Sequence, residues 1–514
     1  MDNRYILTFL FFMTVYLSFG QQNYKRVHKD AFEEAMSYIY EEDYPTAFSI
    51  YKVLYPLDTN YAEINYTMGL CLMNIRGSED DAFPYLKKAV KGNVKEATFW
   101  LARSYHIQAN FNEAIKYYKI YNKNENKDIP TNEVERHIKM SYKAKEMMNN
   151  PVQVEIVNMG DKINTQYSEY VPVVSSDQTE LYFTSRRPES TGGQLDDYGN
   201  YFEDIYYAKS TDGKWSTAKN IGPPLNTPTH DAVVSLTADG SEMVIYRTNV
   251  NLYGGDLYLS DHLAGSWTEA MKLTQNINSP YQEASATISP DGQLMYISSN
   301  RPGGLGGKDI YRARRLPDGN WSLPQNLGPT INTPYDEDSP FIQADGRTLY
   351  FSSNGHGTMG GYDIFKTKLE NDEIWSDPKN VGYPINTVKD DIYYVVSPDG
   401  KTAYYSSDME GGYGNQDIYK INILYDDERK AIFKGLAINL DNKKPIKAKV
   451  TIIDLYTRKI HGIYNSNTKN GKFLLFMYCL CSNMAPFTPP PPATYQSTNL
   501  NHKGRRIRKR RTNI

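Results

Sequence analysis

A strand-turn-strand element recurs five times through the middle of the chain, and its spacing limits the fold more than any other feature. Four of its turns are Asp-Gly pairs, which favour tight hairpins because glycine reaches the positive φ that such turns need. From the second copy onward the period is 52 to 54 residues, whereas the first two turns are 62 residues apart. The five turns lie at Asp177-Gln178, Asp239-Gly240, Asp291-Gly292, Asp345-Gly346 and Asp399-Gly400.

Each copy continues with a second set of recurring residues. An aspartate opens the next strand, as in Asp309-Ile-Tyr311, and a tryptophan then opens a further strand in four copies. Four strands per unit at this period predict the blades of a β-propeller. A residue that recurs at one offset in every blade is expected to support the blade. These structural positions are Asp204, Asp256, Asp309, Asp363 and Asp417, with Trp215, Trp267, Trp321 and Trp375.

The number of copies predicts that the ring closes. Five turn strands are followed by only four tryptophan strands, and the segment Val154 to Met159 aligns with the outer-strand region of the later copies. We expect this segment to pair with the last blade, after Tyr419. Closure would leave no free sheet edge. Residues 152–424 are therefore predicted to form one five-bladed propeller.

Residues 28–150 show a helical pattern that repeats every 32 to 35 residues. Small residues recur at one position, namely Ala35, Gly69 and Ala102, and let paired helices approach closely. This is the spacing of tetratricopeptide repeats, which stack into an α-solenoid. The second copy carries an insertion around Arg76 to Glu79. Such a solenoid can offer a face to a partner protein or pack against the next domain, and the sequence leaves both open.

The first 20 residues have the features of a signal peptide. Arg4 precedes an apolar run from Tyr5 to Phe19, and small residues follow, so a mature start near Gln21 is predicted. The alternative is a short membrane anchor, although the run falls short of a spanning length. No cysteine lies at the cleavage point, so a lipid anchor is not indicated, and the chain's three cysteines are too few for a disulfide framework.

The C-terminal part divides into two segments of different character. Residues 432–475 resemble the start of a carboxypeptidase regulatory-like β-sandwich, with about four of the roughly seven strands that such a sandwich needs. Residues 476–514 form a tail without acidic residues, which ends in "KGRRIRKRRTNI". That tail is either a basic arm for nucleic acid or anionic lipid, or an aberrant end. We favour the aberrant end, because a sandwich broken within a strand has no physical rationale.

The stretch "SPDGQLMYISSNRPGGLGGKDIY" and its copies resemble WD40-like propeller repeats of the TolB type, across about Val152 to Leu424. The order signal peptide, tetratricopeptide repeats, propeller and small sandwich is similar to OmpA-family, PorE-like envelope proteins. That resemblance implies the periplasm and the outer membrane, with type IX secretion or peptidoglycan organisation as the setting. Such proteins usually end in an OmpA-like domain that binds peptidoglycan, and this sequence does not show that domain. A peptidoglycan partner is therefore expected only if such a domain exists.

A carboxylate follows each repeat asparagine by five residues. In a closed ring these five acids would lie near one rim of the channel, where they could bind a cation or a basic partner. The alternative, which we favour, is that each supports its own loop through hydrogen bonds to backbone amides. The five weak metal candidates are Glu169, Asp231, Glu283, Glu337 and Asp391.

The sequence shows no catalytic or cofactor motif. It lacks a Gly-x-Ser-x-Gly elbow, a His-Glu-x-x-His pair and a phosphate loop, and five equivalent acids do not supply one acid and one base. We therefore expect a non-enzymatic scaffold without cofactor or nucleic acid, with envelope proteins as partners. The alternative is a periplasmic receptor or enzyme that acts on glycans or peptides. Aromatic residues and broken symmetry at one channel mouth would favour that alternative.

Overall fold

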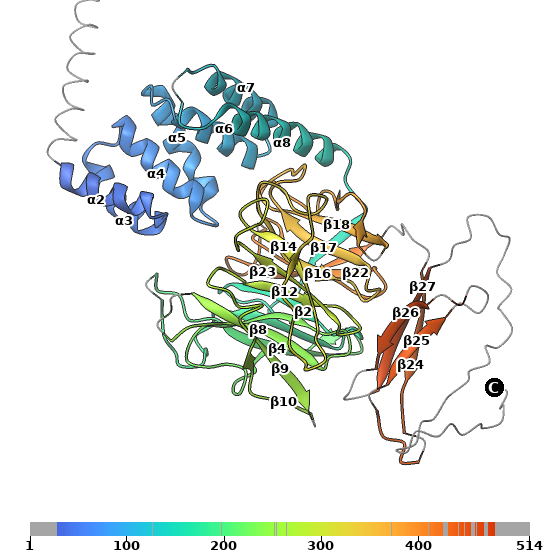
Figure 1. Ribbon diagram of the computed structural model, residues 1–514. Coiled ribbons are helices and arrows are strands. Elements are labelled where there is room, and N and C mark those ends of the chain that lie inside the picture. The colour runs from blue at the N-terminus through green and yellow to red at the C-terminus, as the bar shows by residue number, and fades with distance from the viewer. Residues whose placement is uncertain are drawn as a thin grey trace, which may run out of the picture.

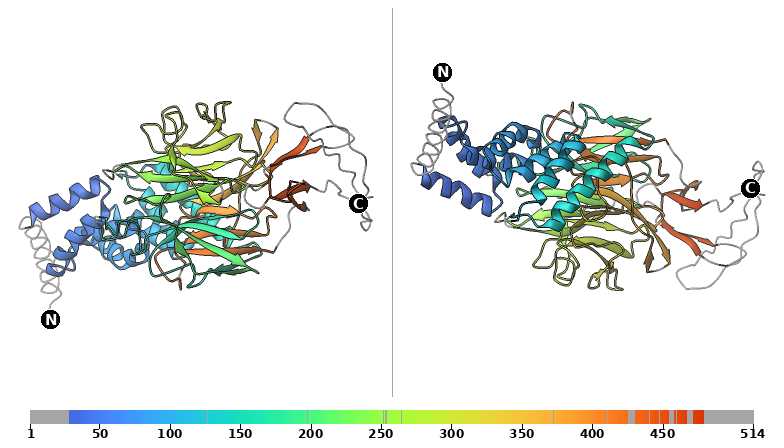
Figure 2. Two further views of the ribbon diagram at one scale, coloured as in Figure 1. Left: turned by 90° about the horizontal axis from the view of Figure 1, so that it is seen from below. Right: turned by 90° about the horizontal axis from the view of Figure 1, so that it is seen from above.

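The computed structural model describes residues 28–478, apart from positions 126, 197, 251, 253, 264, 372, 410, 425–429, 440, 447, 454–457, 459 and 467–470. The predicted signal peptide and nearly all of the predicted tail therefore lie outside the described residues. Among the described residues, no helix is long and apolar enough to cross a membrane. The propeller lies between an N-terminal helical region and a small C-terminal set of strands (Figures 1 and 2).

The helical region consists of helix pairs followed by one long helix. Gly69 shows why small residues recur here, because a Cβ at this position would lie 2.6 Å from the Leu86 side chain of the paired helix. The helices are α2 (Lys29–Tyr40), α3 (Tyr44–Leu54), η1 (Tyr55–Leu57), α4 (Ala62–Asn74), η2 (Glu79–Ala82), α5 (Phe83–Lys91), α6 (Ala97–Ile107), α7 (Phe111–Asn122) and α8 (Thr131–Asn149).

Residues 154–423 form a five-bladed β-propeller, in which each blade is one antiparallel sheet. In each blade the predicted turn joins the first two strands, and a longer loop leads to the third. These three strands are β2 (Glu169–Val174), β3 (Glu180–Ser185) and β4 (Asp204–Thr211) in blade 1; β7 (Asp231–Leu236), β8 (Glu242–Thr248) and β9 (Gly255–Leu263) in blade 2; β12 (Ser285–Ile288), β13 (Leu294–Ser299) and β14 (Asp309–Arg314) in blade 3; β16 (Glu337–Ile342), β17 (Thr348–Ser353) and β18 (Asp363–Asn371) in blade 4; and β21 (Ile392–Val396), β22 (Thr402–Ser407) and β23 (Asp417–Ile423) in blade 5.

The outer strand differs from the sequence-based expectation in one detail. Three of the tryptophans lie on two-residue strands that fold back on the third strand, and Trp321 forms an isolated bridge with Arg315. The outermost sheet position belongs to a second short strand that follows. The tryptophan strands are β5 (Lys214–Trp215), β10 (Ser266–Trp267) and β19 (Ile374–Trp375); the outermost strands are β6 (Lys219–Asn220), β11 (Met271–Lys272), β15 (Gln325–Asn326) and β20 (Lys379–Asn380).

The ring closes as predicted. Strand β1 (Val154–Asn158) pairs antiparallel with β23, with Val154 opposite Ile423 and Asn158 opposite Tyr419. The N-terminal strand thereby supplies the outer strand of blade 5 and pairs the edge of β23 that would otherwise be open.

The tryptophans pack between neighbouring blades. Trp267 of blade 2 meets Tyr182 of blade 1 edge to face, with ring centroids 6.1 Å apart, and Trp375 of blade 4 meets Tyr296 of blade 3 in the same way at 6.0 Å. Trp321 is 1% exposed in a cluster that includes Val244 of the preceding blade. These contacts join blades that share no hydrogen-bonded sheet.

The C-terminal strands form two separate two-stranded sheets. Strand β24 (Lys430–Leu436) pairs with β27 (Lys472–Tyr478), and β25 (Lys449–Ile453) pairs with β26 (Ile460–Asn465). Four strands fit here, as expected, but no sandwich of sheets is shown. Strand β27 also continues to Tyr478, past the boundary at residue 475 that the sequence predicts for this segment.

Candidate functional site: the mouth of the propeller channel

The five predicted rim carboxylates are buried and support their own loops. In each case the residue four positions earlier donates its backbone N–H to the carboxylate, for example Thr165 to Glu169 at 2.8 Å and Thr333 to Glu337 at 2.7 Å. The same loop residue also donates its hydroxyl. The bonds recur at Asp231, Glu283 and Asp391.

Arginines neutralise three of these carboxylates. Arg187 lies 3.1 Å from Glu169, and corresponding pairs form at Asp231 and Glu283. Burial raises the pKa of Glu169 and of Asp391. Among the described residues, no group of three or more His, Cys, Asp or Glu side chains is arranged to hold a metal ion. The carboxylate oxygens are thus engaged by the protein itself.

The aspartates that open the third strands hold the glycine loops. Asp363 accepts from the backbone N–H groups of Met359 and Gly360 and from the Asn380 amide at 2.6 Å. Burial raises the pKa of Asp363 to about 7. Loop amides and an outer-strand asparagine also surround Asp204, Asp309 and Asp417, whereas Asp256 pairs with Lys272 at 2.6 Å.

The position directly before each of these aspartates forms a further ring, whose side chains differ from blade to blade. We call the end of the channel at which this ring lies the mouth. In four blades its carbonyl accepts the N–H of the next blade's rim carboxylate, so the backbone is equivalent in these four blades. The Glu203 carbonyl, for instance, accepts from Asp231 at 2.8 Å. The side chains nevertheless differ in size, charge and polarity. The five positions are Glu203, Gly255, Lys308, Tyr362 and Gln416.

The inner strands add a second variable ring at the same mouth. The residue after each rim carboxylate is Tyr170, Ala232, Ala284, Asp338 or Ile392. Strands β2, β16 and β21 are bulged directly after this position. At the bulges Val171, Ser339 and Tyr393 have φ of 51°, 51° and 60°, which is unusual for residues other than glycine. Bulges re-aim side chains, and such strain gathers at functional sites.

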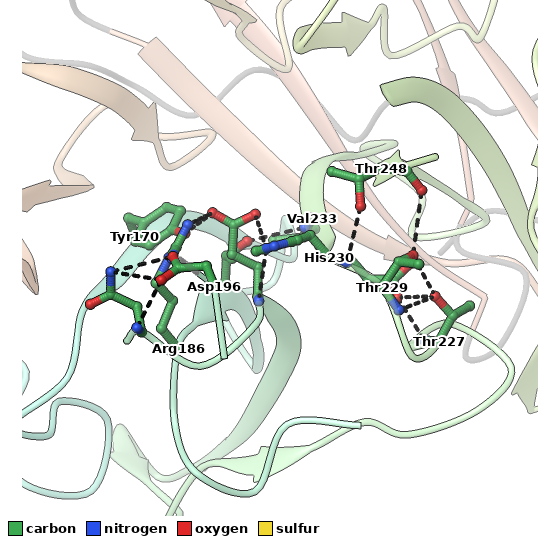
Figure 3. Close-up of polar contacts among 12 residues, drawn as sticks. Tyr170, Arg186, Asp196, Thr227, Thr229, His230, Val233 and Thr248 are labelled. Carbon is green, nitrogen blue, oxygen red and sulfur yellow. Dashed lines mark hydrogen bonds and ion pairs between the residues drawn. The ribbon is translucent and has the colours of Figure 1, made fainter. Parts of the chain in front are cut away.

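In blade 1 the two rings meet in a buried polar network (Figure 3). The Tyr170 hydroxyl donates to Glu203, and Arg186 donates to Glu203 at 3.0 Å and to Asp196 at 2.7 Å. His230 of the next blade places Nδ1 3.3 Å from the other Glu203 oxygen. Both carboxylate oxygens of Glu203 are therefore held by neighbouring side chains.

This network fixes the protonation of its members. Burial opposes the charge on Glu203, but the hydrogen bond to His230, the charge of Arg186 and the Tyr170 hydroxyl together lower the pKa of Glu203 to about 2. Burial and the Glu203 charge raise the pKa of Tyr170 well above its ordinary range. At neutral pH the mouth thus presents an ionised carboxylate beside a protonated phenol.

Asp338 forms a second cluster on the opposite sector, where blades 3 and 4 meet. It accepts from the Ser285 hydroxyl, from the backbone N–H of Ser339 at 2.7 Å and from Lys308 Nζ at 2.8 Å. Burial opposes the charge of Lys308, but Asp338 and Asp336 raise its pKa. Lys308 therefore remains an ammonium paired with Asp338.

Tyrosines complete the mouth above an apolar channel. A Cβ at Gly255 would lie 2.5 Å from the Tyr246 ring, so glycine leaves room for that ring. Burial, with the charge of Asp338 next in size, raises the pKa of Tyr393. Tyr170, Glu203, Tyr246 and Tyr393 border a cavity of about 220 Å³, whose deeper walls are mainly apolar. That volume exceeds the ~150 Å³ of an engineered cavity that binds benzene.

These residues were not predicted from the sequence, because the repeat pattern indicates residues that recur and these differ from blade to blade. A signal was present in the repeat alignment itself. The positions directly before each repeat aspartate and directly after each rim carboxylate are the ones that differ between blades. Broken symmetry within an otherwise regular ring would have pointed to Glu203, Lys308 and Asp338.

Comparisons with known proteins bear on the fold. No family model matches the chain, and no curated protein matches it. Among solved structures, an α-L-arabinofuranosidase from Lactobacillus brevis is similar at 15% identity and a TM-score of 0.35, over 53% of this chain and 95% of that one. An endo-arabinase from Bacteroides thetaiotaomicron matches at 15% identity and 0.33, over 53% and 98%. A β-1,2-mannobiose phosphorylase from Listeria innocua matches at 11% and 0.34, over 53% and 92%.

The prediction that the chain is not an enzyme is corrected. The propeller proteins that it resembles are named as glycosidases and a phosphorylase, although identities of 11 to 15% and such TM-scores bear on the fold alone. The premise of that prediction also fails within this chain. It considered only the five repeated acids at the rim and left out Glu203 and Asp338, which occupy different environments at the mouth.

Proposed function

We propose that this chain acts on glycans and binds a neutral carbohydrate at the mouth of its propeller channel. The observation that carries the proposal is the broken symmetry of the mouth, where tyrosines and Glu203 from different blades line an apolar cavity. Asp338, which pairs with Lys308, lies beside the lining residue Ser339. A concave apolar site with a few placed polar groups is the usual form of a small-ligand site.

The chemistry of the mouth suits sugar rings. Tyrosine rings offer apolar faces with a polar tip, and a sugar offers apolar ring faces between hydroxyl groups that both donate and accept. Carboxylate oxygens accept from hydroxyls, while phenol and ammonium groups donate to them. Glu203 is paired with Arg186, and Asp338 with Lys308, so neither sector presents an unpaired charge. This favours a neutral ligand over an ionic one.

Cleavage of a glycosidic bond takes two carboxyl groups in different protonation states. Glu203 is held as a carboxylate, because its pKa is lowered to about 2. It can accept hydrogen bonds and stabilise positive charge, but it does not donate a proton at neutral pH. Asp338 is a second carboxyl group near the mouth, but its pairing with Lys308 does not provide the protonated acid that cleavage requires. The contacts therefore support carbohydrate binding, and cleavage is tested separately in the assay below.

The test uses purified full-length chain and a panel of neutral arabino-, manno- and gluco-oligosaccharides of two and five sugar rings. Titration calorimetry should detect binding of one series, and Tyr393→Phe and Asp338→Asn should each weaken it about tenfold, or about 1.4 kcal/mol. Tyr40→Phe is the matched control, because Tyr40 is exposed on α2. Reducing-end assays on the same ligands show whether recognition leads to cleavage. Absence of binding across the panel would reject the proposal.

The domain identities and the cellular location that we propose are inferred from the sequence. We infer that the helical region is a tetratricopeptide solenoid, which its small-residue spacing supports, and that the C-terminal strands belong to a carboxypeptidase regulatory-like module. Export to the periplasm and association with envelope proteins are part of the same proposal. N-terminal sequencing of the mature protein from an envelope fraction tests the export step, with Gln21 as the expected first residue.

A further inference from the structure

The segment that interrupts the second helical repeat lies against the propeller. It follows α4 and turns at Gly77, whose φ of +80° a residue with a side chain rarely adopts. Helix η2 begins at Glu79 directly after it. Because the segment lies outside the regular helix pair, the packing of the helices alone gives no reason for it.

Two acidic residues at the start of η2, directly after this segment, are held by a lysine of the propeller. Lys389 Nζ lies 3.4 Å from Asp80 and 4.0 Å from Glu79, and it also lies 3.4 Å from Asp408 of blade 5. Lys389 is part of the loop that leads to Asp391, one of the rim carboxylates. The segment is therefore fixed over the blade-5 sector of the mouth.

Arg76 reaches the variable ring itself. With the side-chain oxygen of Gln416 facing the helical region, it accepts from the Arg76 guanidinium at 2.7 and 3.3 Å. Gln416 occupies in blade 5 the position that Glu203 occupies in blade 1, and its carbonyl accepts from Glu169 at 2.8 Å. The charge of Arg76 also acts on Tyr393, which lines the channel.

The guanidinium keeps donors for a ligand. An arginine has five N–H donors in a fixed fork, and the contacts to Gln416 engage two of its nitrogens. The side chain of Arg76 remains exposed. A sugar hydroxyl placed above Tyr393 would meet donors that come from the helical region rather than from a blade.

We propose that Arg76 is a specificity-determining residue, which binds the outer ring of an oligosaccharide whose first ring occupies the propeller mouth. This inference rests on the proposed function and adds to it the length of the ligand. The helical region then forms one wall of the site, and the chain prefers oligosaccharides over single sugars and disaccharides.

The experiment compares two ligands of one series on the full-length chain. Calorimetry measures the Kd of the disaccharide and of the pentasaccharide for the wild type, Arg76→Ala and Arg76→Gln. Lys91→Ala is the matched control, since it removes one positive charge from the exposed end of α5 in the same region. Melting temperatures establish that each variant is folded.

We expect Arg76→Ala to weaken the pentasaccharide about tenfold and to change the disaccharide less than twofold, with Arg76→Gln intermediate and Lys91→Ala without effect. Equal weakening of both ligands, or of neither, overturns the role of Arg76 while the proposed function stands. If the wild type binds no member of the panel, the proposed function fails and this inference fails with it.

Discussion

The Asn158 side chain donates a hydrogen bond of 2.7 Å to Asp417, and so ties the first strand of the propeller to its last blade. The Asn158 oxygen accepts from Gly160 and from Asn164, each at 2.8 Å. Asn326 makes the same three contacts within blade 3, to Asp309, Gly328 and Asn332. The N-terminal strand thus reproduces the chemistry of an ordinary outer strand across the closure.

Asn158→Ala should lower the stability of the propeller. The substitution removes three hydrogen bonds and leaves buried partners without them, which costs about 1 to 3 kcal/mol. Differential scanning calorimetry measures the change, with Asn326→Ala as the matched substitution inside one blade. Similar falls in melting temperature are expected for the two variants. A fall for Asn326→Ala alone would show that the closing strand contributes little.

The tryptophans should differ in their effect on stability according to burial. Trp321 and Trp375 are 1% and 6% exposed, whereas Trp215 and Trp267 are half-buried. Truncation of a buried tryptophan to alanine costs about 3 to 5 kcal/mol, so Trp321→Ala should lower the melting temperature more than Trp215→Ala. Carbohydrate affinity of the folded variants should be unchanged. Loss of affinity at unchanged stability would contradict the packing role.

Glu203 should contribute stability that depends on pH. Its pKa is lowered from 4.5 to about 2 in the folded chain, so its contribution is present above pH 4.5 and is lost as the pH falls toward 2. A shift of this size corresponds to about 3 kcal/mol. Glu203→Gln should therefore be less stable than the wild type at pH 7, and the two should converge near pH 2 in denaturant titrations. A difference that does not vary with pH would contradict the network.

The repeat pattern allowed the blades and their closure to be predicted, because both depend on residues that recur. Hairpin glycines, inter-blade tryptophans and the strand that contains Asn158 are determined by local backbone chemistry and a fixed period. The mouth could not be predicted in this way. Glu203 contacts Tyr170, and Lys308 contacts Asp338. The partners of each pair are about 30 positions apart, and each pair occurs at one place in the ring.

The sequence pattern also did not predict how the helical region contacts the propeller. His106 on α6 donates from Nε2 to the carbonyl of Met359 in blade 4 at 2.9 Å, and its Nδ1 lies 2.8 Å from the Ser141 hydroxyl. Phe111, Ala144 and Met359 pack in the same cluster. Neither periodicity nor composition indicates that these distant segments meet. The helical repeats and the propeller repeats each have a regular spacing that does not depend on contact with the other domain.

The docking of the helical region should weaken in acid. Burial, with the charge of Arg103 next in size, lowers the pKa of His106 from 6.5 to about 3. Detachment would expose Nε2 and let the imidazole bind a proton more readily, so docking loses up to about 1.4 kcal/mol per pH unit as the pH falls from 6.5 toward 3. Small-angle scattering should show a larger radius of gyration at pH 4.5 than at pH 7. His106→Gln removes this titration while His137 remains, so its radius should change less; equal expansion of both proteins would assign the effect to other groups.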